Sequence, residues 1–167
     1  VLGQPGHRRR FLNWGVFHAK HQFSQLWKEV NRCLQQRNAL LKRSSVSETL
    51  SQWTASLVEK SENLDALRLD YSNRLKQQFL PLARGLCNVT ELDLEYYRGW
   101  NESQDLKYAY EQDLQTDLKR GFTQKGFHRA EIKVTVKGKP VAEVCSRGEA
   151  KMLSWALALS QLELLPE

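Results

Sequence analysis

Apolar residues recur at helical spacing through most of the chain and alternate at strand spacing in only a few short stretches. From residue 21 to 42 the apolar positions repeat every seven residues, which predicts an amphipathic helix with one apolar stripe. A second stripe runs from Leu50 to Phe79. Its pattern is interrupted near residues 61–63, which predicts a kink or break, and Pro81 predicts its end. Because a short polar loop joins the two helices, we expect them to pair as an antiparallel helical hairpin.

Shorter elements flank this hairpin. They are predicted as helices at residues 7–17 and 103–118, a strand at 89–96, and a strand hairpin that joins 132–136 to 141–144. Gly121 predicts a helix stop, and Trp14, Trp27 and Trp53 lie on helical stripes, where core packing is expected. The sequence therefore predicts a predominantly helical α+β fold, with a helical arm over residues 1–86 and a small α/β lobe over residues 87–167 that ends in a helix.

The most informative motif opens that last helix and reads Cys145-Ser146-Arg147-Gly148-Glu149. A Ser followed three residues later by Glu, just before an apolar run, is a capping box. Ser45 and Glu48 predict a second capping box at the start of the second long helix. Gly148 adds something that a cap does not require, because a residue without Cβ lets an anion approach the backbone. The free N–H groups and the dipole of a helix N-terminus favour phosphate, so the residues leave a plain cap and a phosphate site as alternatives.

The net charge of +6 is unevenly distributed. Residues 1–43 carry +8, residues 44–118 carry −6, residues 119–151 carry +6 and the remainder carries −2. Two basic blocks around an acidic middle suggest an anionic partner, with nucleic acid first, and solvated charge is the alternative. The candidate DNA contacts are Arg8, Arg9, Arg10, Lys125 and Arg129. Three consecutive arginines on a helix point in different directions, so we expect at least one of Arg8–Arg10 to pair instead with an acid of the helical middle, residues 44–118.

Other classes of protein receive little support. No run of about 18 apolar residues predicts a membrane span. Cys33, Cys87 and Cys145 are odd in number and lack CxxC spacing, which favours reduced thiols in a cytoplasmic protein. His18 and His21 have no third ligand nearby in the sequence, so no metal site is predicted, and no catalytic Ser/His/Asp or Cys/His pattern stands out.

Four segments, in the same order, resemble the RecF family of bacterial ABC-type ATPases. They are Leu2–Asn13 (LGQPGHRRRFLN), Gln36–Leu41 (QRNALL), Thr123–Glu131 (TQKGFHRAE) and Cys145–Glu149 (CSRGE), the last being similar to the ABC signature motif. This chain departs from the usual family residues at Asn13, Phe127, Glu131, Cys145 and Glu149. Of these, Phe127 stands where the family has Pro.

Two nucleotide-binding elements of such ATPases, the P-loop and the acidic strand end that holds Mg²⁺, have no counterpart in this sequence. The only Gly-Lys pair, Gly138-Lys139, is followed by Pro140 and lacks the preceding glycine of a P-loop. No apolar strand ends in the acidic pair that would hold Mg²⁺. We therefore expect this chain to be an internal segment of a larger ATPase, with no enzyme activity and no cofactor of its own.

The resemblance implies an ATPase of recombinational DNA repair that binds ATP and Mg²⁺ and dimerises around the nucleotide. It also implies binding to gapped or junction double-stranded DNA, and a partnership with RecR in loading RecA. By the same match, the nucleotide contacts in trans are Ser146, Arg147, Gly148 and Glu149, facing the γ-phosphate held by the other protomer. Two alternatives remain open: a helical-hairpin interaction module, and a basic nucleic-acid binder without a nucleotide role. The helix over residues 150–165 is apolar on nearly every side, so we expect the isolated chain to self-associate through it.

Overall fold

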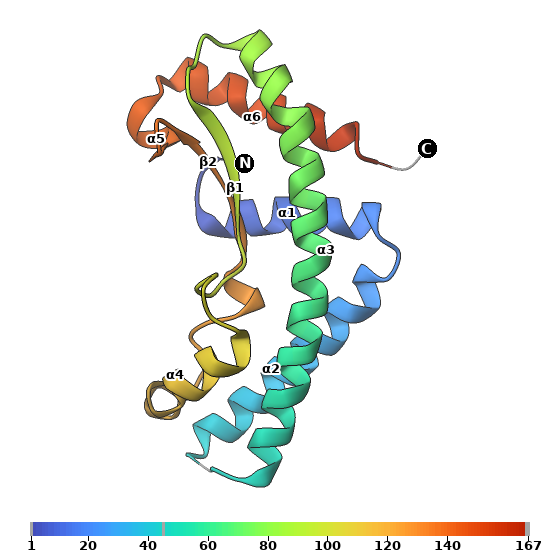
Figure 1. Ribbon diagram of the computed structural model, residues 1–167, viewed down its shortest axis with the longest axis vertical. Helices are drawn as coiled ribbons and strands as arrows, with labels where there is room; N and C mark the ends of the chain where they lie inside the picture. The colour runs from blue at the N-terminus through green and yellow to red at the C-terminus, as the bar shows by residue number, and fades with distance from the viewer. Residues whose placement is uncertain (1, 45, 166–167) are drawn as a thin grey trace. The chain divides into compact units, whose positions relative to one another are not determined.

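The computed structural model describes residues 2–44 and 46–165, as six α-helices with a short 3-10 helix and three strands within those ranges. Figure 1 shows the α+β arrangement that the sequence predicts. The chain divides into two units. A sheet unit contains the chain up to His21, Leu67–Tyr97 and the chain from Glu131 onward; a hairpin unit contains Gln22–Ala66 and Arg98–Ala130. Each unit is assembled from segments on both sides of residue 86, and the arm and lobe boundaries stay a prediction.

The hairpin unit is built on α2 (Phe23–Lys42) and the first part of α3 (Glu48–Leu86). Arg37 Nε donates to Thr54 Oγ1 at 3.2 Å, and Lys60 Nζ pairs with Glu29 Oε2 at 2.7 Å. Later positions on α2 therefore meet earlier positions on α3, which confirms the antiparallel hairpin. The buried side chains of α2 follow the predicted seven-residue stripe and are Phe23, Val30, Cys33, Arg37 and Leu41.

Helix α3 is one helix through residues 61–63, without the break that the sequence allowed there, and it continues past Pro81, where its end was wrongly predicted. Ser61 is fully buried between the buried Leu57 and Leu64, so its small side chain continues the packed stripe. Pro81 is exposed, as is Gln77 four residues earlier, so the carbonyl left without its helical partner can be hydrated.

The start of α3 is capped by a different serine from the one that the sequence suggests. The predicted cap at Ser45 lies outside the described residues. Ser47 Oγ accepts from the Leu50 N–H at 3.3 Å, which is the bond that a capping side chain makes to the first turn of a helix. Ser47 therefore caps α3.

Helix α4 (Leu106–Arg120) completes the hairpin unit close to the predicted position. Asp105 caps its start by accepting from the Tyr108 N–H at 2.6 Å, and Gly121 ends it with a left-handed φ of 73°. The following loop includes the 3-10 helix η1 (Phe127–Arg129). Phe127 is buried and its ring meets Trp27 edge-on, with centroids 5.7 Å apart. Phe127 therefore anchors this loop by packing.

The sheet unit holds three antiparallel strands in the order β1 (Leu92–Tyr97), β2 (Glu131–Val136) and β3 (Lys139–Pro140). Leu94 pairs with Val134, and both face the core. The predicted strand at 141–144 is wrong, since these residues form the short helix α5 (Val141–Val144). Pro140 has no N–H with which to extend the ladder, and its φ of −54° leads into a helical turn.

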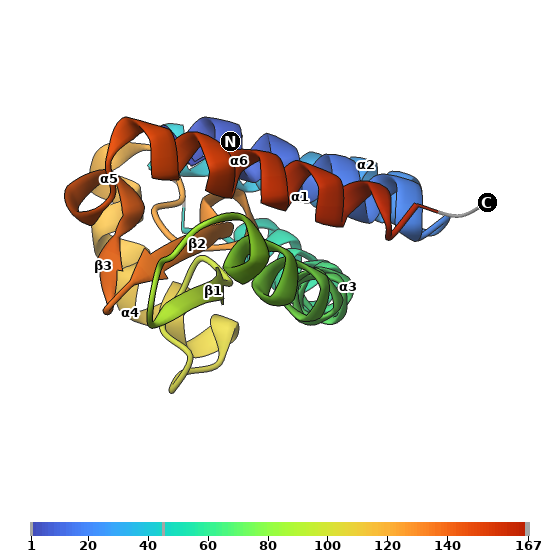
Figure 2. The same cartoon turned by 90° about the horizontal axis from the view of Figure 1, so that it is seen from above.

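Two helices run side by side in the sheet unit (Figure 2): α1 (Pro5–Ala19) and α6 (Arg147–Leu162). Gln161 Nε2 on α6 donates to the Phe11 carbonyl on α1 at 3.1 Å. Helix α6 buries one side and exposes the other, where Trp155, Leu159 and Leu162 are 53%, 48% and 56% exposed.

Trp14 on α1 was expected in the core, and this prediction is wrong. It is 45% exposed and lies against His18, with ring centroids 4.4 Å apart. The three cysteines are free, as expected. No helix in the described part of the chain is long and apolar enough to span a membrane.

Candidate functional site

The N-terminus of α6 carries the capping box that the sequence predicts. The Glu149 N–H donates to Ser146 Oγ at 3.3 Å, and the Ser146 N–H donates to Glu149 Oε2 at 2.8 Å. Ser146 has extended backbone angles (φ −62°, ψ 163°), so the helix proper begins at Arg147. The Ser146 oxygen acts as the acceptor in the cap, so its hydroxyl proton can donate either to the Glu149 carboxylate or to a group outside the helix.

Gly148 lies in the exposed first turn of α6 and has no packing reason to lack a side chain. Apart from its chain neighbours and the nearby backbone of its own helix, the one described atom within 4 Å of a Cβ at this position is Ser146 Oγ, at 3.9 Å. Glycine inside a helix is about 1 kcal/mol less favourable than alanine. Contacts within the described chain therefore do not account for this glycine, and its backbone N–H is open to an external anion.

The charges at this helix end are mixed. Ser146, Arg147 and Gly148 are exposed. The hydrogen bonds from the Ser146 backbone and side chain hold the pKa of Glu149 below its usual value of 4.5, so this carboxylate is ionised at neutral pH. The Arg147 guanidinium is the neighbouring charge of opposite sign. Ser146, Arg147 and Gly148 can donate hydrogen bonds to a phosphate, whereas the Glu149 carboxylate would repel it.

Cys145, which precedes the cap, does not add a nucleophile. Burial, followed by the charges of Glu149 and Cys87, raises the pKa of the Cys145 thiol above its usual value of 9.0. A thiol with a raised pKa is protonated at neutral pH and is a poor nucleophile. The α6 cap is therefore suited to binding rather than to covalent chemistry.

The structure separates the three predicted arginines of α1. Arg8 Nη2 forms an ion pair with Glu131 Oε2 at 2.8 Å and Arg8 also donates to the Gly3 carbonyl, so it is committed within the sheet unit. Arg9 and Arg10 have no hydrogen bond or ion pair with the residues that the structure describes. An arginine of this cluster therefore does pair with an acid, but that acid, Glu131, lies on β2 and not in the acidic helical middle where the sequence placed it.

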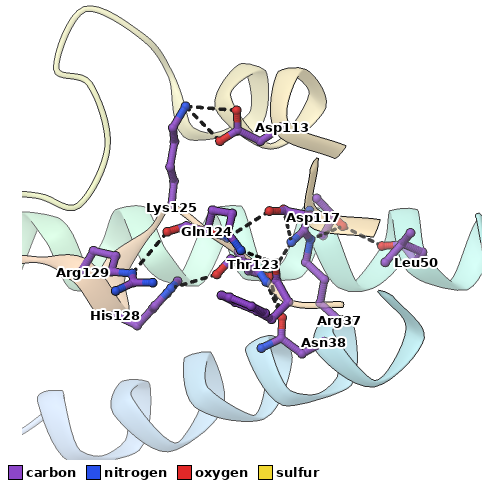
Figure 3. Close-up of polar contacts among 12 residues, drawn as sticks. Arg37, Asn38, Leu50, Asp113, Asp117, Thr123, Gln124, Lys125, His128 and Arg129 are labelled. Carbon is purple, nitrogen blue, oxygen red and sulfur yellow. Dashed lines mark hydrogen bonds and ion pairs between the residues drawn. The ribbon is translucent and has the colours of Figure 1, made fainter. Parts of the chain in front are cut away.

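The other two predicted cations lie on the loop after α4 (Figure 3). Lys125 Nζ pairs with Asp113 Oδ2 at 2.9 Å. Arg129 is exposed, and its Nε donates to the Gln124 carbonyl at 3.3 Å, which leaves its outer nitrogens free to turn outward. His128 Nε2 donates to the Thr123 carbonyl at 3.2 Å and serves the loop structure.

A buried polar network holds this loop, and sequence reasoning missed it (Figure 3). Arg37 Nη1 pairs with Asp117 Oδ2 at 2.9 Å, and both side chains are 1% exposed. Arg37 also donates to Thr123 Oγ1, while Asn38 Oδ1 accepts from the Thr123 N–H at 2.9 Å. The one available signal was Arg37 on the apolar stripe of α2, since a buried guanidinium needs a partner. Nothing in the local pattern identifies Asp117, 80 residues away, as that partner.

No three His, Cys, Asp or Glu side chains within residues 2–44 and 46–165 are placed to hold a metal ion. No protein-family model matches the chain.

Curated relatives match almost the whole chain. The DNA replication and repair protein RecF of Chromohalobacter salexigens is 39% identical over 99% of this chain, and that of Pseudoalteromonas translucida is 37% identical over 98%. The match covers 46% of each relative, so the chain spans about half the length of the curated relatives that it matches.

Solved structures agree with this match. The recombination mediator protein RecF with ATP in the RecFOR pathway superimposes with a TM-score of 0.85 over 97% of this chain and 47% of the other, at 24% identity. The same protein with ATPγS gives a TM-score of 0.84 at 25% identity. On sequence and fold together, this chain belongs to the RecF family.

Proposed function

We propose that this chain supplies the signature half of a shared nucleotide site in a RecF-like recombination mediator. The observation that supports this is the exposed cap of α6, where Gly148 lacks a side chain without any packing reason among the described residues. The Ser146 hydroxyl and the Gly148 N–H would donate to the γ-phosphate of an ATP held by a second protomer. Arg147 would offset negative charge there, and Glu149 would keep the cap in place. The bound nucleotide, with Mg²⁺, supplies the phosphoryl chemistry.

The wider role of the protein is proposed from its family. The curated relatives are named DNA replication and repair proteins, and the solved relatives are placed in the RecFOR pathway. We propose an ABC-type ATPase in the cytoplasm that acts at gapped or junction DNA and, with RecR, helps to load RecA. In this protein residues 1–86 would form the arm and residues 87–167 would form part of the ATPase lobe.

The chain alone should neither bind ATP measurably nor hydrolyse it. A hydroxyl, an N–H group and a helix dipole offer too little to hold a triphosphate in water, and the sequence has no P-loop. Isothermal titration calorimetry of the 167-residue chain with Mg-ATP measures this directly. Micromolar affinity would show that the site is not half of a shared one.

The role of Ser146 can be tested in a protein of the full length of the relatives. Ser146→Arg should leave ATP binding in place while abolishing ATP-dependent dimerisation, because the larger cation blocks the approach of the second protomer's nucleotide. Ser103→Arg adds the same charge at an exposed position in the hairpin unit and should dimerise normally. If Ser146→Arg loses ATP binding itself, the role proposed for Ser146 is wrong.

We also propose that the chain binds DNA through its positive charge, without preference for a DNA sequence. The two basic blocks favour this, as do Arg9 and Arg10, which have no ion-pair partner among the described residues. Affinity should fall steeply with salt, because binding to phosphates releases counterions. A helical-hairpin module that binds only proteins is the alternative, and it predicts no salt-dependent DNA affinity for the 167-residue chain in fluorescence anisotropy.

A further inference from the structure

Two helices of the hairpin unit end beside each other, and each ends in a pair of cations. Helix α2 ends with Lys42 and its C-cap Arg43, and α4 ends with Lys119 and Arg120. Gly121, directly after α4, lies against Lys42: a Cβ at this glycine would be 3.3 Å from Lys42 Cγ and 3.7 Å from Lys42 Cα. All four cationic residues are exposed.

A fifth cation joins this cluster through Gln124. Arg120 Nη1 donates to Gln124 Oε1 at 2.9 Å, and the Gln124 carbonyl accepts from Arg129 Nε at 3.3 Å. Figure 3 shows Arg129 and Gln124 on the same loop. We call this set the tip surface; its members are Lys42, Arg43, Lys119, Arg120 and Arg129.

The positive charge of the tip surface is not balanced within the described part of the chain, where none of its members forms an ion pair. The two acids of α4 on the side of this loop are already used, since Asp117 is buried against Arg37 and Asp113 pairs with Lys125. The C-terminal dipoles of α2 and α4 favour cations, but each amounts to only about half a charge. The positive charges of the tip surface therefore face solvent with little to offset them.

We propose that the tip surface is the main site at which this chain holds the phosphate backbone of double-stranded DNA. This inference rests on the DNA binding proposed above and assigns it to a surface of which the sequence analysis singled out only Arg129. Most of its cations are arginines, whose planar fork matches phosphate oxygens. Phe122 lies within the same loop and is 40% exposed, which offers an apolar ring that DNA can use and an acidic peptide does not need. Arg8, by contrast, is already committed to Glu131.

The test compares two variants with equal reductions of charge in the 167-residue chain. In the tip variant Lys42, Arg43, Lys119 and Arg120 become Ala. In the control variant four exposed cations outside the tip surface become Ala: Lys28, Arg32, Lys137 and Lys139. Fluorescence anisotropy with a labelled duplex over a range of salt concentrations gives the log–log slope, and circular dichroism melting checks that both variants fold.

The slope for the tip variant should become shallower by about 0.9 for each phosphate that is no longer neutralised, a total of about two to four, while the control keeps the slope of the unmodified chain. An unchanged slope in the tip variant, or equal changes in both variants, would overturn this assignment and leave DNA binding itself in place. No salt-dependent DNA binding by the unmodified chain would overturn the proposed DNA binding as well. Tighter binding of a polyglutamate peptide than of DNA would overturn the assignment by giving the tip surface to an acidic protein.

Discussion

Gly15 sits on the inner side of α1, where the side chains of Tyr71 and Gln161 meet. Gln161 Nε2 donates to Tyr71 Oη at 3.0 Å, and a Cβ on Gly15 would overlap both of these groups. We expect Gly15→Ala to lower the free energy of unfolding by about 1–3 kcal/mol, because the packed neighbours must shift. Gly85→Ala is the matched control, since a Cβ there meets no described atom within 4 Å apart from its chain neighbours and the nearby backbone of its own helix. Urea denaturation of the two variants measures the difference, and equal stabilities would contradict the packing described for α1.

Arg37 should be among the residues whose removal costs the most stability. Arg37→Ala leaves the Asp117 carboxylate buried and unpaired, which costs about 3–5 kcal/mol. Replacing both residues, as Arg37→Met with Asp117→Leu, should recover most of this stability, because neither charge is then buried alone. Arg10→Ala, at an exposed residue, provides the control. A double variant as unstable as Arg37→Ala in chemical denaturation would show that the pair is not what holds this loop.

Residues of the candidate site differ in how far the sequence predicts them. Ser146 and Glu149 form a cap within one helical turn, so their geometry follows from local sequence alone. Arg8 is held by an ion pair with Glu131, 123 residues away, and no local sequence pattern specifies such a contact. Local chemistry was therefore predictable, and the choice of ion-pair partners was not.

At the scale of elements, the cap of α6 should make the stability of this helix depend on pH. The folded-state pKa of Glu149 is lowered from 4.5. Its contribution is therefore complete above pH 4.5 and is lost as the pH falls through the lower folded value. Glu149→Gln keeps an acceptor for the Ser146 N–H but does not titrate, so it should remove this part of the acid dependence. Hydrogen exchange of the first-turn amides of α6 between about pH 3 and 6, compared between the two proteins after correction for intrinsic exchange rates, measures the effect. Equal pH dependence would mean that Glu149 does not support the cap in solution.

The spacing of apolar residues, together with glycine and proline as end signals, predicted most helices and strands. These signals failed where tertiary packing determines the local structure. The seven-residue repeat located α2 and the core of α3, and Gly121 marked the end of α4. Pro81 is a strong local stop signal, yet the buried Phe79 and Ala83 hold the helix on both sides of it. Residues 141–144 carry apolar spacing that suits either a strand or a helical turn, and Pro140 favours the turn.

For the whole molecule, the sequence predicts the class of fold but not how its segments combine. The hairpin unit joins Gln22–Ala66 to Arg98–Ala130, and α3 belongs to both units. The buried Ser61 carries the packed stripe of α3 through the apolar interruption at residues 61–63, and no separate signal marks the point near Leu67 where the helix passes from one unit to the other. Discontinuous units of this kind depend on long-range contacts, which periodicity does not encode.

The exposed side of α6 predicts how the isolated chain behaves in solution. Trp155, Leu159 and Leu162 are spaced by four and three residues, so they lie along one face of the helix and form an apolar stripe. Full burial of a large apolar side chain is worth about 1.5–3 kcal/mol, and covering the exposed half of each of these three contributes roughly half of that. We therefore expect two copies of the chain to associate through them. Light scattering should therefore show a dimer or larger species whose population rises with protein concentration.

Replacing the three stripe residues by Gln should give a monomer, since Gln keeps a high helix propensity but removes the apolar surface. Val46 and Leu69 are also exposed, at 67% and 46%, but do not belong to α6, so Gln at both of these positions should leave self-association unchanged. If the unmodified chain instead remains a monodisperse monomer at high concentration, the side chains of the stripe are covered in solution by the chain itself. The chain has five tryptophans, so the difference in emission between the unmodified chain and a Trp155→Phe variant then provides the second reading, because a covered indole emits at shorter wavelength than a half-exposed one.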